Sequence, residues 1–569
     1  MLSHDASSQP EAANVFSCGV IASPSIMWQQ NYRFAGGSLG YSALIAAMPL
    51  LLLFYLLGVR RRPAWVAGLS ALGVAWAIAL VAIRMPVEQA VAATLDGAAF
   101  GVFPISWIVF SSILLYRIAV DTGKFEIIKD SLGALTDDRR LQLLLIAFSF
   151  SSFIEGSAGF GSPVAVSAAM MAGLGFPPFY AAVFCLVGNT APVAFGSIGI
   201  PIITLTQITG LPMPLLSAMT GRILSVIAVL VPIYLVVLMA GVKKTLAVWP
   251  AVLACGLGFG AMQLFVSNVI GPELTDILSA LTSIGAMVLL MKYWQPARTF
   301  RLPDDEPATQ RHKQHGAGTM VLAWTPYLLL VVFVLLWGYM PVRTLLERVT
   351  ATIQVPGLHN MIQRIPPVTA QPAPYAAIYT FNWLSAAGTS CLLACIVAAL
   401  ALGVTPRRFA SLYIATIRQL ALPMVTIASV LALAYLMNYA GMTSTLGLAF
   451  AATGVAFPFF SSTLGWLGVV LTGSVTSSNA LFGNLQVVTA TSLGMNPILM
   501  ASANAAGGVM GKMISPQSIA VAVAATGMAI SDEGKLFRFM LRHSIVLVTV
   551  VGLLVLFYAY WFPALVPRV

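Results

Sequence analysis

The sequence predicts an all-α protein that crosses a membrane many times. Of its 569 residues, 59% are hydrophobic and only 8% are charged, and the mean hydropathy is +0.91. A soluble globular chain carries roughly 25% charged residues, so water is not the main solvent of this chain. Apolar stretches long enough to span a hydrocarbon core as helices recur along the sequence. We therefore expect a single helical bundle in the bilayer.

The apolar stretches predict spans, in chain order, near 41–58, 64–83, 101–120, 141–154, 221–242, 246–267, 274–292, 320–340, 376–403, 410–438, 443–460 and 544–565. Two further regions, 155–210 and 465–530, are apolar enough to be buried but too rich in Gly, Ser, Asn and Pro for plain lipid-facing helices. Together these regions raise the expected number to about 12 to 14 spans, some of them broken or re-entrant.

The first 26 residues are polar and lack the basic start and apolar core of a secretory signal peptide. Met27 opens the run MWQQNY. We expect 1–26 to be a disordered N-terminal extension and 27–569 to form one transmembrane domain.

The net charge of +11 comes from short basic clusters between apolar stretches. These clusters are Arg60–Arg62, the basic residues of 117–140, Lys243–Lys244, the 296–315 loop and Arg407–Arg408. Short basic loops face the cytoplasm, so the clusters read as topology signals and require no nucleic-acid partner. The 341–373 loop should then be periplasmic.

No pattern for metal binding or catalysis is present. The five cysteines have neither zinc-site nor disulfide-framework spacing, and the five histidines are dispersed. The sequence also lacks a Walker A loop and a G-x-S-x-G elbow. We expect neither an enzyme, nor a metal, nor a cofactor.

An internal repeat links the two Gly-rich regions. The first copy passes through Gly156-Ser157, Asn189, Gly196 and Pro201, and the second through Gly473-Ser474, Asn504, Gly511 and Pro516. The successive intervals are 33, 7 and 5 residues in the first copy and 31, 7 and 5 in the second. Paired, Gly- and Pro-interrupted segments in two halves are typical of a secondary transporter and indicate its binding site. We place the two repeat motifs at about 155–210 and 472–525, with each Gly-Ser pair breaking its helix.

Irregular backbone at membrane depth must be buried in protein or line a wet cavity, so FIEGSAGFGSP (153–163) and TGSVTSSNALF (472–482) are expected to flank a substrate path. Helix starts expose amides that suit a carboxylate, and Ser and Thr add donors. The substrate-binding candidates in these segments are Ser157, Gly159, Gly161, Ser474, Thr476, Ser477, Ser478 and Asn479. Close helix packing is the other use of small residues in membranes.

Two ionisable residues fall inside the repeats, where a charge is costly and is usually paired or functional. Lys512 is the candidate counter-charge for a substrate carboxylate, and Glu155 is the candidate proton-coupling group. The alternative is that both cap helices or form structural ion pairs. Further substrate-binding candidates are Asn189, Thr190, Asn504, Ser515 and Gln517, with interhelical bonding equally open for the Asn residues.

At these motifs the sequence resembles the L-lactate permease family along nearly all its length from Met27. The resemblance rests on MWQQNY, FIEGSAGFGSPVAV, NTAPVAFGSIGIP, SNVIGPEL, LGWLGVVLTGS with TSSNALF, and GGVMGKMISPQSIA. It implies a multi-pass protein of the bacterial cytoplasmic (inner) membrane that imports L-lactate, and also D-lactate and glycolate, together with protons. Its partners would be these small carboxylates, protons and the lipid bilayer.

Three positions depart from the family's pattern. Val475 stands where an Asp usually follows Gly-Ser, and Thr380 and Asn382 stand where a Lys and an Asp are usual. One hypothesis is that a charge network was lost together, which would leave coupling to Glu155, change the coupling or favour another 2-hydroxy acid. A sodium-coupled carrier of another small carboxylate is the closest alternative function, because hydroxyls and backbone carbonyls also coordinate Na⁺. A channel or ligand sensor is the rival from another class.

Overall fold

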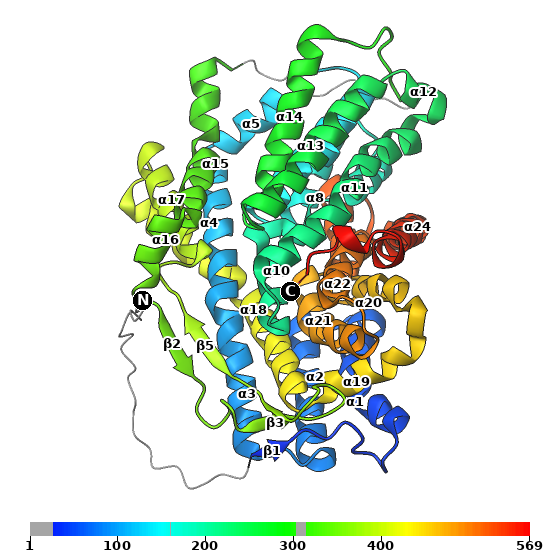
Figure 1. Ribbon diagram of the computed structural model, residues 1–569. Helices are drawn as coiled ribbons and strands as arrows, with labels where there is room; N and C mark the ends of the chain where they lie inside the picture. Colours follow the sequence, from blue (N-terminus) through cyan, green and yellow to red (C-terminus); the bar gives the residue numbers. More distant parts are fainter. Residues whose placement is uncertain (1–26, 160, 303–314, 569) are drawn as a thin grey trace, which may run out of the picture.

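The computed structural model describes residues 27–159, 161–302 and 315–568, and these residues are mostly helical (Figure 1). The predicted disordered extension, 1–26, lies outside the described residues. Ten described helices are long and apolar enough to cross a membrane: Leu39–Val59, Ala64–Ala82, Val87–Asp121, Met213–Ala240, Trp249–Val269, Thr275–Tyr293, Gly318–Gly338, Pro406–Tyr439, Met442–Thr472 and Ile530–Tyr560. An eleventh span results if Pro178–Gly188 and Val193–Thr209, which meet at 61°, are counted as one.

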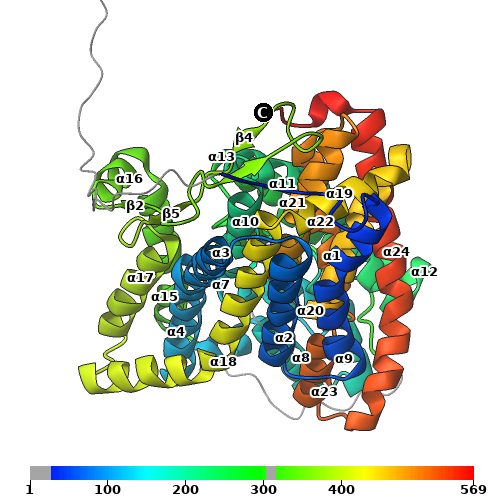
Figure 2. The same cartoon turned by 90° about the horizontal axis from the view of Figure 1, so that it is seen from below.

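These spans contain the labelled helices α1 (Leu39–Phe54), α2 (Ala64–Ala77), α3 (Val87–Phe100), α4 (Trp107–Asp121), α11 (Met213–Ala240), α13 (Trp249–Val269), α14 (Thr275–Tyr293), α15 (Ala317–Gly338), α18 (Pro406–Tyr439), α19 (Met442–Phe450), α20 (Phe457–Thr472) and α24 (Glu533–Tyr560). Short connecting helices are α5 (Lys124–Gly133), α6 (Arg139–Leu143), α12 (Val242–Leu246) and α16 (Met340–Glu347). α18 changes direction along its length (Figure 2), and Pro423 lies inside it.

The span count is lower than the 12 to 14 predicted from sequence. Two apolar helices, α8 (Ser162–Gly173) and α17 (Ala387–Ala401), have 12 and 15 residues. At 1.5 Å per residue they reach about 18 and 22 Å, short of a hydrocarbon core of about 30 Å. The predicted class, an all-α polytopic protein with broken helices, is confirmed.

Five short strands lie at one end of the bundle. Strand β1 (Trp28–Gln29) pairs in parallel with β3 (Ile362–Arg364), which pairs antiparallel with β4 (Ala373–Pro374). Strands β2 (Ala351–Gln354) and β5 (Ile378–Phe381) form a separate antiparallel pair. The predicted loop at 341–373 therefore contains α16 and three of these strands. This segment also ties the start of the described chain, through β1, to the middle of the sequence.

The repeat predicted from sequence corresponds to two sets of four helices. The first set is α7 (Ser151–Ser157), α8, α9 (Pro178–Gly188) and α10 (Gly196–Thr209), and the second is α20, α21 (Val475–Ser492), α22 (Pro497–Lys512) and α23 (Pro516–Thr526). α8 packs against α23, and α10 packs against α21. The segment after the first break of each copy therefore meets the segment after the second break of the other. Figure 1 shows α10 beside α21 at the centre of the molecule.

The two copies break their helices at different points. In the second copy, Gly473 ends α20 with a left-handed φ of +70°, and Ser474 caps α21 with its hydroxyl, as the sequence predicted. In the first copy the prediction was wrong, because Gly156 and Ser157 stay inside α7 and the break follows them, between α7 and α8. Gly159 and Gly161 carry the positive φ angles there, +57° and +86°. These two glycines supply the conformation that other residues rarely adopt.

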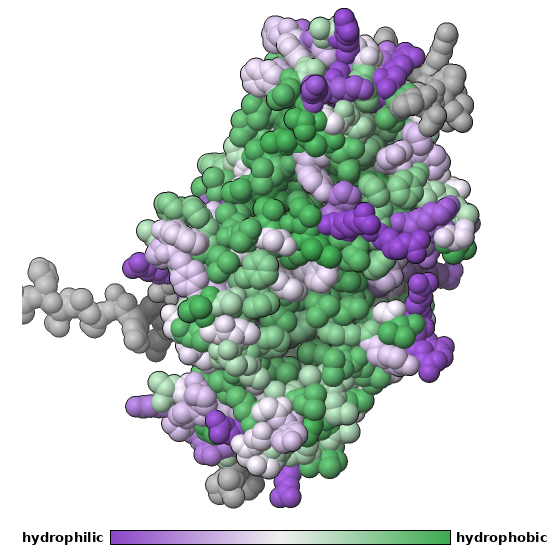
Figure 3. Space-filling model, turned by 90° about the vertical axis from the view of Figure 1, so that its right-hand side faces the viewer, coloured by the Kyte–Doolittle hydropathy of each residue, from purple (hydrophilic) through white to green (hydrophobic). Residues whose placement is uncertain are grey.

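The outer surface is apolar across most of its height. Figure 3 shows hydrophobic residues over most of one face, with hydrophilic residues at its two ends and along one side, from which one group reaches towards the middle. Large hydrophobic side chains remain exposed on several spans, among them Leu44, Leu69, Leu264, Leu289 and Leu553. Such a surface is stable in hydrocarbon and not in water. The protein is therefore a multi-pass membrane protein.

Candidate substrate cavity between the two repeats

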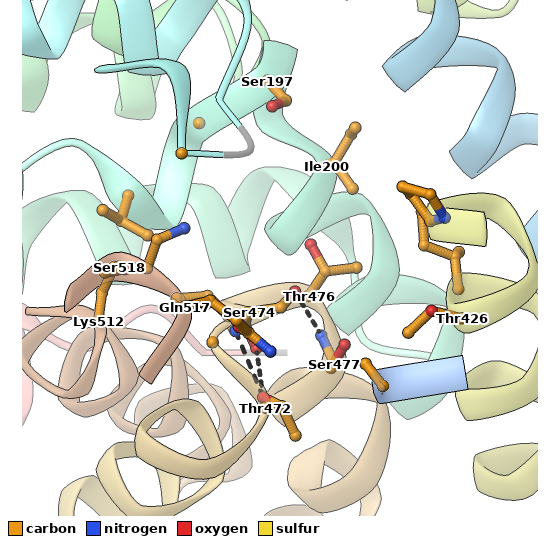
Figure 4. Close-up of a pocket in the computed structure, with 18 of the residues that line it drawn as sticks. Ser197, Ile200, Thr426, Thr472, Ser474, Thr476, Ser477, Lys512, Gln517 and Ser518 are labelled. Atoms are coloured by element: carbon orange, nitrogen blue, oxygen red, sulfur yellow. Dashed lines mark hydrogen bonds between the residues drawn. The ribbon is translucent and has the colours of Figure 1, made fainter. Parts of the chain in front are cut away.

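A cavity of about 500 Å³ lies where the two repeat copies meet. The first copy contributes Glu155, Gly161 and the segment at Gly196–Pro201, and the second contributes Thr472–Ser477, Lys512 and Gln517. The start of α2 and the middle of α18 complete the wall, for example with Trp65 and Thr426. Figure 4 shows Lys512, Gln517 and Ser518 on one side and Thr426 on another, with Ser197 and Ile200 facing the Ser474–Ser477 segment.

Four helices of the two repeats begin at this cavity. Gly161 precedes α8, Ile200 begins the regular part of α10, Ser474 caps α21, and Gln517 lies in the first turn of α23. The start of a helix carries partial positive charge because its first amides have no partner within the helix. Four such starts around one cavity make it attractive to an anion.

Hydroxyl groups and one cation add to this polarity. Ser474 accepts a hydrogen bond from the amide of Ser477 at 3.2 Å, and its own amide donates to Thr472 at 3.3 Å (Figure 4). The hydroxyls of Thr476 and Ser477 line the cavity and bond to no other described residue. Lys512, at the end of α22, is half-buried and has no ion-pair partner in the described part of the chain. These donors are free for a ligand.

Glu155 is the acidic group of the cavity. It is 3% exposed, and one carboxylate oxygen accepts a hydrogen bond from the amide of Asn189 at 2.9 Å. A Cβ atom on Gly196 would lie 2.7 Å from the other oxygen, so this carboxylate packs on the backbone where α10 begins. Among the described residues Glu155 has no basic partner. A buried carboxylate without a counter-charge is costly when ionised.

The two breaks of each copy support one another. A Cβ atom on Gly159 would lie 2.1 Å from the hydroxyl of Ser197, which donates to the carbonyl of Ala158 at 3.2 Å. In the second copy, a Cβ atom on Gly473 would lie 1.6 Å from the side-chain oxygen of Gln517. The first break of each copy is therefore held against its second break, beside the cavity.

Some predicted residues lie outside the cavity and bond helices together. Asn479 donates to the carbonyl of Pro201 at 2.9 Å, and so joins the second copy to the first. Asn504 donates to Asn479 at 3.0 Å and accepts from Gln486 at 3.1 Å. All three amide side chains are fully buried. This chain of buried amides holds α22, α21 and α10 in fixed relation.

The cavity brings together seven of the residues singled out from sequence: Glu155, Gly161, Ser474, Thr476, Ser477, Lys512 and Gln517. The others do not line it: Ser157, Gly159, Asn189, Thr190, Ser478, Asn479, Asn504 and Ser515. Sequence reasoning missed four polar lining residues, Ser197, Thr426, Thr472 and Ser518. Three of these, Ser197, Thr472 and Ser518, lie within the predicted repeats, where neighbouring residues were predicted instead. Thr426 comes from α18, outside the repeats, and no sequence signal marks it.

The three positions that depart from the family pattern do not meet. Val475 lines the cavity, whereas Asn382 lines a second cavity on the strand-bearing side of the bundle and Thr380 lies in β5. The structure therefore gives no support to one lost charge network. No group of three or more His, Cys, Asp and Glu that could hold a metal ion occurs in residues 27–159, 161–302 and 315–568.

Two broken-helix repeats enclosing a cavity that contains hydroxyl groups, a lysine and a glutamate, within a bundle of membrane spans, are typical of secondary membrane transporters. A family model described as L-lactate permease matches residues 42–562, and the chain belongs to this family. As a permease it is a transporter and not an enzyme.

Curated relatives match along their whole length. The L-lactate permease of Bacillus subtilis (strain 168) is 44% identical, with 95% of this chain and 100% of the relative covered. The glycolate permease GlcA of Escherichia coli (strain K12) is 44% identical, covering 94% and 99%, and the L-lactate permease of the same strain is 43% identical, covering 95% and 100%. Among solved structures, the Alcanivorax borkumensis YdaH transporter aligns with a TM-score of 0.45 at 14% identity, and the alignment covers 91% of this chain and 100% of that chain. Neisseria gonorrhoeae MtrF aligns with a TM-score of 0.46 at 13% identity, and the alignment covers 84% of this chain and 86% of that chain.

Proposed function

We propose that this protein imports L-lactate, together with D-lactate and glycolate, across the bacterial cytoplasmic membrane by proton symport. The observation that carries the proposal is the meeting of four helix starts and the unpaired Lys512 at one cavity. This arrangement suits a carboxylate, and the hydroxyls of Thr476 and Ser477 suit a 2-hydroxyl group. The names of the relatives, L-lactate permease and glycolate permease, support the same substrate class.

The side of the membrane that the cavity faces follows from the positive-inside rule. Pro63, Ala64 and Trp65 line the cavity and come directly after Arg60–Arg62. The basic loops at 243–244 and 296–315 precede α13 and α15, whose far ends lie on the strand-bearing side. The substrate cavity then lies towards the cytoplasm, and the strands face the periplasm. This conformation corresponds to the release of substrate into the cell.

Glu155 is the group that couples the proton. Its carboxylate contacts Asn189, at the end of α9, and the backbone of Gly196, at the start of α10. The bend of the α9–α10 pair lies between these two contacts. Binding a proton removes the buried charge, so the loaded carrier no longer carries the cost of moving an ionised acid. Proton binding is thereby linked to a segment whose bend can change during alternating access.

Transport into proteoliposomes under separately imposed proton and sodium gradients tests the function. We expect an inward proton gradient to drive accumulation of radiolabelled L-lactate, and a sodium gradient alone to drive none. D-Lactate and glycolate should compete for this uptake, and acetate, which lacks the 2-hydroxyl, should compete more weakly.

The controls separate the rival functions. Accumulation under the sodium gradient alone would assign a sodium-coupled carrier. Equilibration of lactate that no gradient concentrates would assign a channel, and binding without any flux would assign a sensor. Liposomes containing the Gly473→Pro variant, which alters the break between α20 and α21, provide a matched protein control that should show no uptake.

A further inference from the structure

A second buried carboxylate lies close to the substrate cavity and has no partner. Asp276 is 1% exposed, and neither of its carboxylate oxygens hydrogen-bonds any other group in the described part of the chain. It stands in the first turn of α14 and lines neither the substrate cavity nor the second cavity. Buried carboxylates are nearly always paired or hydrogen-bonded, so an unpartnered one points to a function.

Asp276 lies directly against the segment that carries Glu155. A Cβ atom on Gly156 would lie 2.7 Å from the Cβ of Asp276 and 3.0 Å from the backbone nitrogen of Ile277. Only glycine at position 156 therefore lets α14 approach α7 this closely. The Asp276 carboxylate is also near enough to that of Glu155 for the two charges to interact. The first Gly-Ser pair does not break its helix. Its glycine instead allows α7, which carries Glu155, to lie directly against Asp276.

The surroundings of Asp276 offer no compensating cation. The main elements packed against α14 are α7, α10, α13 and the π-helical turn Leu144–Phe150. Glu155 is the only Asp, Glu, Lys, Arg or His within their bounds. The one other titratable group, Cys255 of α13, has its thiol directed at Ser149 and Ser283. Two adjacent carboxylates repel when both are ionised, so binding one proton stabilises the pair.

Another acid, Glu273, precedes Asp276 by three residues in the sequence. Glu273 lines the second cavity, of about 500 Å³, together with Arg343 and the segment at 267–272. Burial raises the pKa of the Glu273 carboxyl, and the positive charge of Arg343 opposes that rise. By the sidedness argued above, this cavity faces the periplasm. Asp276 thus comes three residues after an acid that lines the periplasmic cavity, and it packs against Gly156, the neighbour of the acid that lines the substrate cavity.

We propose that Asp276 is a second proton-binding carboxylate of this carrier and passes protons from the second cavity to Glu155. The inference rests on the proposed proton symport and adds one group to it. In the transfer, the O–H bond of protonated Asp276 breaks and the proton binds a carboxylate oxygen of ionised Glu155. Asp276 is then reprotonated from the second cavity, where Glu273 lies at its wall. The proton is the only species that moves, so no oxidant or other reactant is needed.

A purely structural role makes different predictions. An acid in the first turn of a helix is stabilised by the helix dipole, and Asp276 would then act as an ionised group that supports α14. In that case its replacement by Asn would lower stability and leave the proton-to-lactate ratio and the pH profile unchanged. In the relay, the same replacement changes both.

The test uses the full-length protein in proteoliposomes and compares wild type with Asp276→Asn. We expect lactate accumulation under an inward gradient of one pH unit to fall about tenfold, to the level without a gradient. Lactate counterflow should persist, but its dependence on pH between 5.5 and 8 should flatten, because one proton-binding group is lost. Asp276→Glu keeps an acid at this position and is expected to retain the pH dependence.

Matched variants make each outcome decisive. Ser279→Ala, one turn along α14, removes a hydroxyl bonded to the Thr275 carbonyl and should match wild type. Wild-type accumulation and pH profile in Asp276→Asn would overturn the relay while leaving symport intact, whereas absence of proton-driven uptake in wild type would defeat the proposed function itself. If Asp276→Asn does not fold, Asp276→Ser supplies a smaller neutral side chain for the same comparison.

Discussion

The two repeat copies have the same order of four helices, but their matching asparagines make different hydrogen bonds. In the first copy Asn189 ends α9 and donates to Glu155, whereas in the second Asn504 lies inside an unbroken α22 and donates to Asn479. The position before each Gly-Ser pair also differs, with Glu155 in one copy and Thr472 in the other. The first copy thus supplies the acid, and the second supplies Lys512 and most of the hydroxyls.

The backbone shows the same division. In the first copy Ser197 and Ile198 adopt left-handed φ angles of 48° and 60°, which are unfavourable for residues with side chains and most of all for a β-branched one. At the matching break of the second copy, between α22 and α23, Met513 and Ser515 keep ordinary φ angles of −62° and −63°, and the Ser515 hydroxyl caps α23. Such strain costs of order 1–3 kcal/mol per residue and occurs at sites that switch. We infer that the first copy is the part that changes shape, while the second holds the anion.

The largest effects are expected where a glycine of each copy packs closely against a backbone carbonyl. A Cβ on Gly465 of α20 would lie 1.9 Å from the carbonyl oxygen of Asn504, and a Cβ on Gly188 of α9 would lie 2.0 Å from that of Ala147. Both contacts adjoin the matching asparagines, but the glycine comes from the first helix of the second copy and from the third helix of the first copy. Gly465→Val and Gly188→Val should each cost about 3 kcal/mol or more and abolish the yield of monodisperse protein.

Thermal unfolding and size-exclusion chromatography in detergent measure this loss. Gly73→Ala, where nothing lies within 4 Å of the added Cβ, is the control and should match wild type. If one Val variant is stable and the other is not, the close glycine contact is required in only one of the two copies.

Glu155→Gln tests whether coupling belongs to the first copy. One-to-one symport concentrates lactate about tenfold for each pH unit of gradient, since a tenfold ratio corresponds to about 1.4 kcal/mol. We expect this accumulation to disappear, as measured by radiolabelled uptake. Thr472→Val, at the matching position of the second copy, should keep the wild-type proton-to-lactate ratio. Retained accumulation in Glu155→Gln would move the coupling group elsewhere.

Lys512→Gln tests the anion-binding role of the second copy. Removing a hydrogen bond between charged groups costs about 1.5–3 kcal/mol, so the KM for lactate should rise about 10- to 100-fold. Initial rates of uptake at saturating proton gradient give this value. Lys535→Gln removes an exposed lysine paired with Asp532 and should leave KM unchanged. An unchanged KM in Lys512→Gln would exclude a direct contact with the substrate.

The smallest effect is expected for Val475→Asp, which restores the family's usual acid in the second copy. A carboxylate in the cavity repels the substrate anion, so KM at pH 8 should rise about two- to fivefold, on the order of 1 kcal/mol or less. Proton uptake per lactate, followed with an internal pH dye, should stay at the wild-type ratio if Glu155 carries the proton as proposed. A higher ratio would show that position 475 can share coupling.

Several features followed from the sequence alone. The apolar runs required a membrane bundle, because hydrocarbon accepts only helices or closed barrels. The spacing of Gly, Asn and Pro revealed the two repeats, although the first break lies at different residues in the two copies. Glu155 and Lys512 stood out because charges are rare in such segments, and both line the cavity.

Other features depended on contacts between distant segments, which local patterns do not encode. The sequence does not say that Asn479 bonds Pro201, that Thr426 reaches the cavity, or that Gly156 meets Asp276. No sequence pattern singles out Asp276, and only the packing of α14 on α7 shows that it is buried without a partner among the described residues. Composition and periodicity determine which solvent a segment prefers, whereas the neighbours of a buried charge are set by how the whole bundle packs.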